Sequence, residues 1–148
     1  MINNYEEIAL AKFQDGFNCS QSVLFAFAEK FGLDEDIALR ISGAFGAGMG
    51  RTQATCGVVT GAYMVIGLKY AHTRKEEDYR KEITYSKVRE FAERFKAKCG
   101  TTICRELLDG CDLLTEEGHE RFKNESFKDK ICIPCMRESV RILNELLD

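Results

Sequence analysis

The residues of this sequence whose type and spacing could support chemistry are its seven cysteines. A thiolate is both a nucleophile and a ligand for soft metals, so we expect either thiol redox exchange or metal binding. Because seven is an odd number, the cysteines cannot all pair with one another in disulfides. In order along the 148-residue chain they are Cys19, Cys56, Cys99, Cys104, Cys111, Cys132 and Cys135.

The most specific local pattern is Cys132-Ile-Pro-Cys135. Two thiols at this spacing can form a disulfide or bind one metal together. Thioredoxin-type redox motifs share the spacing but need a βαβ context, which the sequence lacks. Covalent haem attachment needs a histidine where Met136 stands. Redox use and metal use of the pair both stay open, and a zinc or iron–sulfur site would take its further ligands from Cys99, Cys104 and Cys111.

Four of the seven cysteines fall in the first turn of a predicted helix. Free backbone N–H groups and the helix dipole favour an anion there by about 0.3–1 kcal/mol. A thiol with an ordinary pKa near 8.5 would therefore reach a pKa of roughly 7–8. Arg51, near Cys56, and Arg105, next to Cys104, could lower these two values further. The four cysteines at predicted helix starts are Cys19, Cys56, Cys104 and Cys135.

The elements that must position these thiols are predicted to be helices. Capping residues, glycines at helix ends and apolar residues at helical spacing recur along the chain, and no stretch alternates as a strand would. Asn18 and Gln21 form a predicted capping box, and Asn4, Asp34 and Thr55 are further predicted caps. The predicted helices cover about 5–15, 19–31, 34–45, 56–70, 75–97, 103–109, 115–126 and 134–147.

The segment 56–70 is apolar on nearly all sides, which predicts a central buried helix. Its glycines, Gly57, Gly61 and Gly67, would let neighbouring helices approach closely. The glycine-rich run 43–51 matches no nucleotide-binding loop, and we expect it to pass close to a helix or to leave space over Cys56. Inward-facing residues are also predicted for the helices at 34–45 and 75–97, namely Ile37, Ala38, Ile41, Phe45, Ile83, Val88, Phe91 and Phe95.

These patterns predict an all-α protein, a compact single-domain multi-helix bundle over residues 1–148. The net charge of −3 argues against a nucleic-acid partner. No run of 18 apolar residues occurs, so no membrane span is expected. The N-terminus lacks a signal-peptide pattern, which favours the cytoplasm. The apolar content of 56–70 is compatible with a homodimer, and His72 and His119 are expected at the surface.

Four separated blocks of the sequence carry most of these features. In this order they resemble the C_GCAxxG_C_C family, a group of proteins with a proposed redox role. The similarity runs from about residue 5 to the C-terminus. The blocks are Gly16-Phe-Asn-Cys19-Ser-Gln-Ser-Val-Leu24, Gly46-Ala-Gly48-Met-Gly50, Cys56-Gly-Val-Val-Thr-Gly61-Ala62 and Cys104-Arg-Glu-Leu-Leu108, followed by a late cysteine.

The resemblance implies a helical protein of mainly anaerobic bacteria and archaea with a redox or metal role. A relative of the family, the split-Soret type of cytochrome, carries haem and an iron–sulfur centre. The sequence departs from the family pattern at Thr55 and at Val58, where alanine is common, and Cys99 and Cys111 look like additions. By resemblance, the functional cysteines would be Cys19, Cys56, Cys104 and either Cys132 or Cys135.

Three functional hypotheses follow. The first is a thiol-based oxidoreductase, in which Cys19 or Cys56 attacks a disulfide and a second cysteine resolves it. Its electron partner would be a redox protein or a small-molecule donor. The second is an iron–sulfur or zinc site without catalytic activity of its own, formed where helix ends meet by Cys19, Cys56, Cys104 and one of Cys132 or Cys135. The third is a helical interaction module with structural cysteines.

Overall fold

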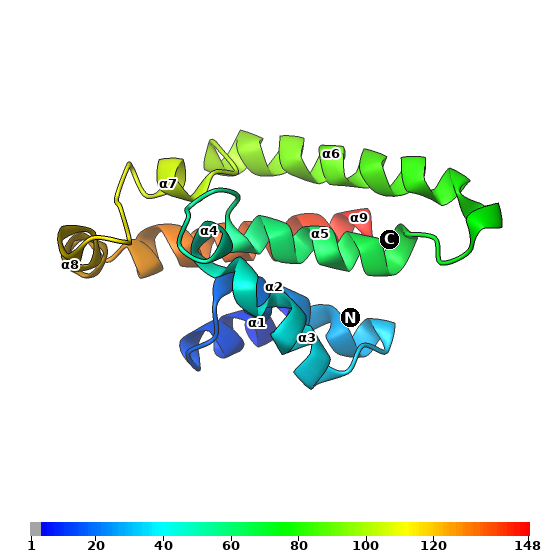
Figure 1. Cartoon of the computed structure of the whole chain (residues 1–148), viewed down its shortest axis with the longest axis horizontal. Helices are drawn as coiled ribbons and strands as arrows, with labels where there is room; N and C mark the ends of the chain where they lie inside the picture. The colour runs from blue at the N-terminus through cyan, green and yellow to red at the C-terminus, as the bar shows by residue number, and fades with distance from the viewer. Residues whose placement is uncertain (1–3) are drawn as a thin grey trace.

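The computed structural model describes residues 4–148, and the secondary structure of that part of the chain is helical (Figure 1). The all-α prediction is therefore confirmed. The longer helices are α1 (Tyr5–Gln14), α2 (Cys19–Ala28), α3 (Glu35–Ser42), α5 (Gly57–Tyr70), α6 (Tyr79–Cys99), α8 (Glu116–Asn124) and α9 (Ile133–Leu146). The short elements are η1 (Glu29–Phe31), η2 (Gly43–Phe45), α4 (Gly46–Met49), η3 (Lys75–Glu77), α7 (Cys104–Leu107) and the π-helix η4 (Lys128–Cys132).

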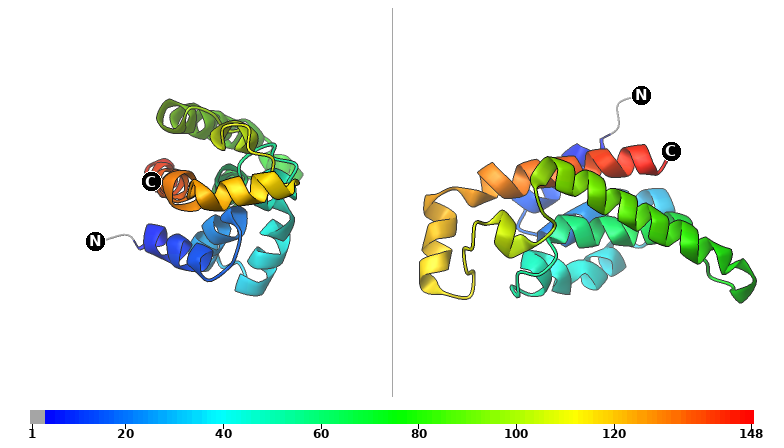
Figure 2. Two further views of the ribbon diagram at one scale, coloured as in Figure 1. Left: turned by 90° about the vertical axis from the view of Figure 1, so that its left-hand side faces the viewer. Right: turned by 90° about the horizontal axis from the view of Figure 1, so that it is seen from above.

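The helices lie in three layers (Figures 1 and 2). Helix α6 runs along one side, α5 and α9 lie side by side in the middle, and α1, α2 and α3 form the other side. Helices α7 and α8 lie at one end of the molecule, and the α5–α6 connection lies at the other. Within residues 4–148 no helix is both long enough and apolar enough to span a membrane.

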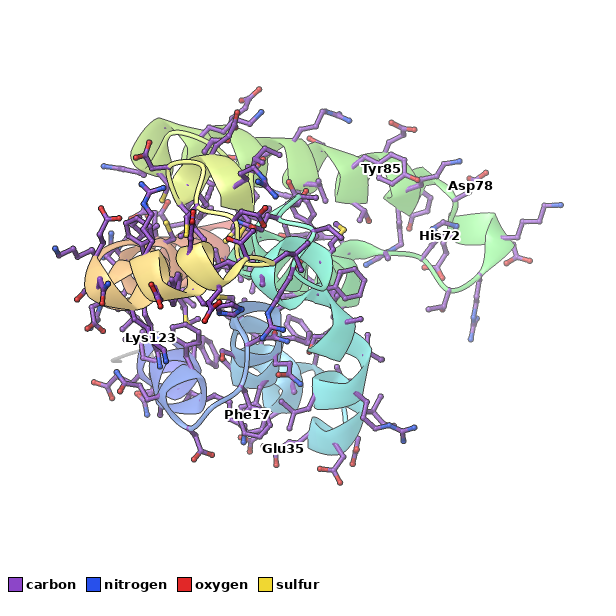
Figure 3. The ribbon with its side chains drawn as sticks, turned by 60° about the vertical axis from the view of Figure 1, so that its left-hand side comes forward. Phe17, Glu35, His72, Asp78, Tyr85 and Lys123 are labelled. Atoms are coloured by element: carbon purple, nitrogen blue, oxygen red, sulfur yellow. The ribbon has the colours of Figure 1, made fainter. Side chains whose placement is uncertain are left out.

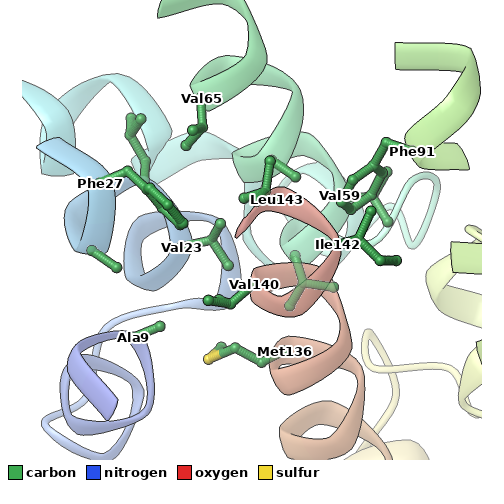
Figure 4. Packing of buried hydrophobic residues seen from close by; sticks show 14 of the residues in the cluster. Ala9, Val23, Phe27, Val59, Val65, Phe91, Met136, Val140, Ile142 and Leu143 are labelled. Atoms are coloured by element: carbon green, nitrogen blue, oxygen red, sulfur yellow. The ribbon is translucent and has the colours of Figure 1, made fainter. Parts of the chain in front are cut away.

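The main hydrophobic core lies where α2, α5 and α9 meet, with α1 and α6 packed against them (Figure 4). Helix α5 contributes buried side chains on several faces, as predicted for the central helix. Helix α9 presents one strongly apolar face to the core. The largest fully buried side chains include Phe27, Phe91, Phe95, Leu24, Ile66, Met136 and Leu143.

Two glycines of α5 allow α2 to pack closely against it. A Cβ atom added at Gly57 would lie 2.9 Å from the Cβ of Cys19, and one added at Gly61 would lie 2.8 Å from the carbonyl oxygen of Ser20. The predicted close approach is therefore confirmed at these two positions. It is wrong at Gly67, where an added Cβ would have no neighbour within 4 Å.

Several residues predicted to face inward are exposed instead. Ile37 and Ile41 are 46% and 52% exposed, because α3 packs mainly against α2 and buries only a narrow face around Ala38 and Ser42. Ile83 is 42% exposed because the N-terminal part of α6 extends beyond the rest of the bundle (Figure 2). Farther along α6, Phe91 is fully buried, as predicted.

Candidate functional site

Five cysteines line one apolar cavity of about 170 Å³. They are the five candidates from the sequence: Cys19, Cys56, Cys104, Cys132 and Cys135. The rest of the wall is largely hydrocarbon, from Phe13, Ala47, Leu107, Leu108, Leu113, Phe122 and Ile131. We refer to this space as the cysteine cavity. Thiols from four separate places in the sequence thus share one largely apolar site.

The position of Cys19 is fixed by the capping box at the start of α2. The Gln21 backbone N–H donates to the Asn18 side chain at 2.9 Å, and the Asn18 backbone N–H donates to the Gln21 side chain at 3.0 Å. The two side chains also donate to the carbonyl oxygens of Gly43 and Leu39, both at 3.0 Å. This start of α2 is therefore tied to α3 and η2, and the predicted capping box is confirmed.

Backbone pairing brings Cys56 and Cys104 together. The Cys56 N–H donates to the carbonyl of Thr102 at 2.8 Å, and the Cys104 N–H donates to the carbonyl of Ala54 at 2.6 Å. These bonds flank an isolated antiparallel bridge between Thr55 and Ile103. Thr55 was predicted to cap α5, but it serves in this bridge, and Cys56 itself occupies the cap position.

A tight loop before the bridge closes one side of the cysteine cavity. Four of its non-glycine residues adopt positive φ, including Ala47 in the cavity wall and Gln53. The buried Gln53 side chain donates to the carbonyl of Cys111 at 2.6 Å and accepts from the N–H of Leu113 at 2.8 Å. Sequence reasoning missed Gln53, because a single glutamine in a loop carries no pattern that predicts burial.

The segment with Cys132 and Cys135 is helical before either cysteine is reached. Helical residues begin at Phe127, and the π-helix η4 leads directly into α9. The N–H of Ile133 bonds to the carbonyl of Lys128, so the amides just before Cys135 are already paired. The prediction that Cys135 lies at a free helix N-terminus is therefore wrong, because the helical hydrogen-bond ladder starts upstream of Pro134.

The thiols of Cys19 and Cys132 form a hydrogen-bonded pair in the cysteine cavity. This hydrogen bond lowers the pKa of Cys132 and, together with burial, raises the pKa of Cys19. Lys128 acts in the same direction on Cys132. Contact with the Cys19 thiol therefore favours a thiolate on Cys132.

A second thiol pair joins Cys135 to Cys99 at the C-terminal end of α6. The contact lowers the pKa of Cys99 and, together with burial, raises the pKa of Cys135. From the sequence, Cys99 was only one possible further metal ligand, and its pairing with Cys135 was not predicted because the two lie 36 residues apart (135 − 99) and share no motif. Cys111 does not line the cysteine cavity. It belongs to a second, smaller hydrophobic cluster, and its thiol donates to the carbonyl of Gly118.

Cys56 and Cys104 are buried without a thiol hydrogen bond of this kind. Burial raises the pKa of Cys56 to about 12, which outweighs the favourable backbone N–H of Val58. Burial raises the pKa of Cys104 to about 11, although Arg105 acts to lower it. The predicted pKa values of roughly 7–8 at helix starts are therefore wrong for these two thiols. Burial destabilises the thiolate by more than the helix N-terminus stabilises it.

A preformed site for a single metal ion is not present among residues 4–148. No group of three or more His, Cys, Asp or Glu side chains in that part of the chain could hold an ion. Histidine does not extend the cysteine cavity, since neither His72 (Figure 3) nor His119, which is exposed on α8, is among the residues that line it. The five cysteines therefore do not fit the closed tetrahedral zinc site considered from the sequence.

Comparison with known proteins bears on this arrangement. The model of one family, "Putative redox-active protein (C_GCAxxG_C_C)", matches residues 17–146. The chain belongs to the C_GCAxxG_C_C family. All seven cysteines lie within the residues that match the C_GCAxxG_C_C model. No curated protein and no solved structure matches the chain, so the family description supports a redox role without giving a mechanism.

Proposed function

We propose that this protein is a dithiol redox protein whose central reaction interconverts two thiols and a disulfide at Cys19 and Cys132. The single observation that carries the proposal is the hydrogen-bonded contact between these two thiols in the cysteine cavity. They come from residues 113 positions apart (132 − 19), so only the folded chain makes them partners. These two side chains alone provide both sulfur atoms of the disulfide.

The reaction balances as a two-electron exchange. The Cys132 thiolate attacks one sulfur of a substrate disulfide and forms a mixed disulfide, which releases the other substrate sulfur as a thiolate. Cys19 then loses its proton and attacks the Cys132 sulfur, which releases the second substrate thiol. The substrate disulfide gains two electrons and two protons, and the protein is left with a Cys19–Cys132 disulfide.

The surroundings favour the two uncharged states of the pair. Burial disfavours thiolates, as the raised pKa values of Cys56 and Cys104 illustrate. A dithiol and a disulfide are both neutral, so hydrocarbon walls tolerate either one. The same walls disfavour the charged sulfinate and sulfonate that oxidation beyond the disulfide state would produce.

The test is a thiol count on the reduced and the mildly oxidised protein, with peptide mapping of the product. Oxidation of the wild type is expected to remove two thiols and to yield a peptide that links Cys19 to Cys132. The Cys19→Ser variant should lose that product. The matched control is Cys111→Ser, which removes a buried thiol outside the cysteine cavity and should retain it. If mild oxidation yields no Cys19–Cys132 link, the proposal is wrong.

A second candidate function is the binding of an iron–sulfur cluster. The specific observation is that Cys56 and Cys104 line the cysteine cavity but belong to neither thiol pair. Each iron of a cluster takes a thiolate from its own side, so the ligands need not converge on one point as they do for zinc. Cys19, Cys56, Cys104 and one of Cys132 or Cys135 would then hold the cluster.

Anaerobic reconstitution with iron and sulfide separates the two candidates. Cluster binding predicts a brown protein with bound iron, and Cys104→Ser should reduce the iron content while Cys111→Ser should not. Dithiol chemistry alone predicts a colourless protein from which gel filtration removes all iron. The iron content and the visible absorption spectrum are the measurements.

A further inference from the structure

A surface groove of about 480 Å³ adjoins the cysteine cavity. The second thiol pair, Cys99 and Cys135, lies in its wall, between the end of α6, α7 and the start of α9. Cys135 also lines the cysteine cavity, so its side chain borders both spaces. Cys99 is partly exposed, whereas Cys135 is only 5% exposed. A reagent in the groove therefore meets Cys99 first.

The four thiols form a continuous series from the groove to the cavity. Cys99 contacts Cys135, and Cys132 contacts Cys19. The link between the two pairs is the Cys132-Ile-Pro-Cys135 segment, in which the two cysteines interact and line the same cavity. Residues three apart on a helix lie on one face. In the series Cys99, Cys135, Cys132, Cys19 the first two and the last two thiols are in contact, and the middle two share the wall of the cysteine cavity.

We propose that Cys99 and Cys135 are an outer dithiol, at which a small anionic disulfide exchanges electrons with the protein, and that Cys132 carries the oxidation inward to Cys19. This inference rests on the proposed dithiol function. The disulfide that Cys132 attacks there is then the outer Cys99–Cys135 disulfide, and the external substrate, a small anionic disulfide, reacts in the groove. Cys99 is one of the two cysteines, with Cys111, that the family resemblance left without a role.

The groove is suited to a small, negatively charged substrate. Its volume lies within the range of small-molecule pockets, about 300–1,000 Å³. Two exposed lysines, Lys98 and Lys130, lie in its wall together with one acidic side chain, Glu106, which accepts a hydrogen bond from Thr101 at 2.5 Å. Glu138 is a further carboxylate close enough to raise the pKa of Cys99, but its charge is paired with Arg141 at 2.7 Å, so the lysines outweigh the unpaired acid of the groove. The lysines lie on both sides of the outer dithiol, on α6 and η4.

The relay balances at every step. The Cys99 thiolate attacks the substrate disulfide and releases one substrate thiol, and Cys135 attacks the Cys99 sulfur and releases the second. Cys132 then attacks Cys135, which frees Cys99, and Cys19 attacks Cys132, which frees Cys135. Each exchange breaks one S–S bond and forms one. The substrate ends as two thiols and the protein as the Cys19–Cys132 disulfide.

The experiment oxidises the full-length reduced protein with oxidised glutathione and quenches it with acid at intervals. In the wild type, the Cys99–Cys135 link is expected to appear first and the Cys19–Cys132 link later. The Cys135→Ser variant should accumulate a glutathione adduct on Cys99. The Cys99→Ser variant should form the inner disulfide with glutathione at least about tenfold more slowly, whereas Cys111→Ser should behave as the wild type.

A small neutral oxidant, diamide, distinguishes failure of the relay from failure of the proposed function. If diamide forms the Cys19–Cys132 disulfide in the wild type and in Cys99→Ser, the inner dithiol is active. The relay is then overturned if glutathione also oxidises both proteins at equal rates, or if the inner link precedes the outer one. If diamide yields no inner disulfide even in the wild type, the proposed function fails first.

The charge requirement has its own test. The double variant Lys98→Gln, Lys130→Gln should react with oxidised glutathione more slowly, on the order of tenfold, because the local concentration of an anionic substrate falls. Its reaction with the uncharged hydroxyethyl disulfide should be unchanged. Equal slowing with both reagents, or no slowing with either, contradicts an anionic substrate. Both lysines are exposed, so the double variant should fold as the wild type does. Circular dichroism checks this.

Discussion

In the core where α2, α5 and α9 meet, regular helices bury valine, leucine and phenylalanine side chains at helical spacing. Around the cysteine cavity the chain is irregular by contrast. It uses a loop with several positive-φ residues, a bridge of two residues and a π-helix. The core is held by the burial of apolar surface, which tolerates small shifts. The cavity is held by specific backbone hydrogen bonds, which fix where each sulfur lies.

This difference teaches that stability and function are separable in this protein. The thiol pairs lie at the border of the core: Cys135 belongs to its cluster, and Cys19, Cys99 and Cys132 are partly buried against it. A substitution deep in the core should lower the stability of the whole chain. A substitution in the loops should instead change how the thiols meet.

The largest effect is expected from Phe27→Ala in the core. Phe27 is fully buried and stacks at a tilt against Tyr5. Its truncation should lower the free energy of unfolding by about 3–5 kcal/mol, since it removes apolar burial and leaves a cavity. Urea denaturation measures the change. Phe25→Ala, at a partly exposed position on the same helix, should cost clearly less; equal losses would contradict a core centred on Phe27.

The next largest effect is expected from Gln53→Leu, which disrupts the loop beside the cysteine cavity and leaves the main core unchanged. The substitution removes both hydrogen bonds of the Gln53 side chain and leaves the buried backbone groups of Cys111 and Leu113 without them. We expect a loss of about 2–3 kcal/mol, together with faster alkylation of Cys104. Unfolding curves and mass spectrometry of alkylated peptides test this. Gln14→Leu, at an exposed position, serves as the control.

Gly61→Ala tests the close approach of α2 and α5. The new methyl group would collide with the Ser20 carbonyl, so we expect a loss of about 1–3 kcal/mol in the free energy of unfolding. Gly67→Ala is its matched partner on the same helix, with open space around the added carbon. It should stabilise the protein by about 0.5–1 kcal/mol, because alanine loses less backbone entropy. Thermal unfolding should therefore move in opposite directions for the two variants.

The smallest effect concerns helix capping far from the cysteine cavity. The Asp34 side chain accepts the N–H of Ile37 at 2.9 Å at the start of α3, so Asp34→Ala should cost about 1 kcal/mol. Asn4 occupies the cap of α1 but makes no capping hydrogen bond with its side chain. Asn4→Ala should therefore leave the unfolding curve unchanged. A clear loss for Asn4→Ala would mean that cap position alone, without the bond, stabilises this protein.

The sequence determined the elements that depend on local patterns. Helical periodicity predicted the all-α fold and the central burial of α5, and the Asn18–Gln21 spacing predicted the start of α2, because such signals lie within a few residues of one another. The positions of the cysteines and the four sequence blocks around them also indicated which five cysteines were candidates for the site. Neither Ile41 nor Ile83 was placed correctly, since which apolar face is covered depends on neighbours that the sequence does not name.

Only the tertiary structure decided which thiols meet. The pairing of Cys99 with Cys135 and of Cys19 with Cys132 spans tens of residues, and no local rule relates such positions. The tertiary structure also reversed the expected acidity of Cys56, because burial is a property of the whole fold and outweighs the helix end that the sequence reveals. Residue types set the chemistry available to this chain, whereas long-range packing selects the sulfurs that can take part in it.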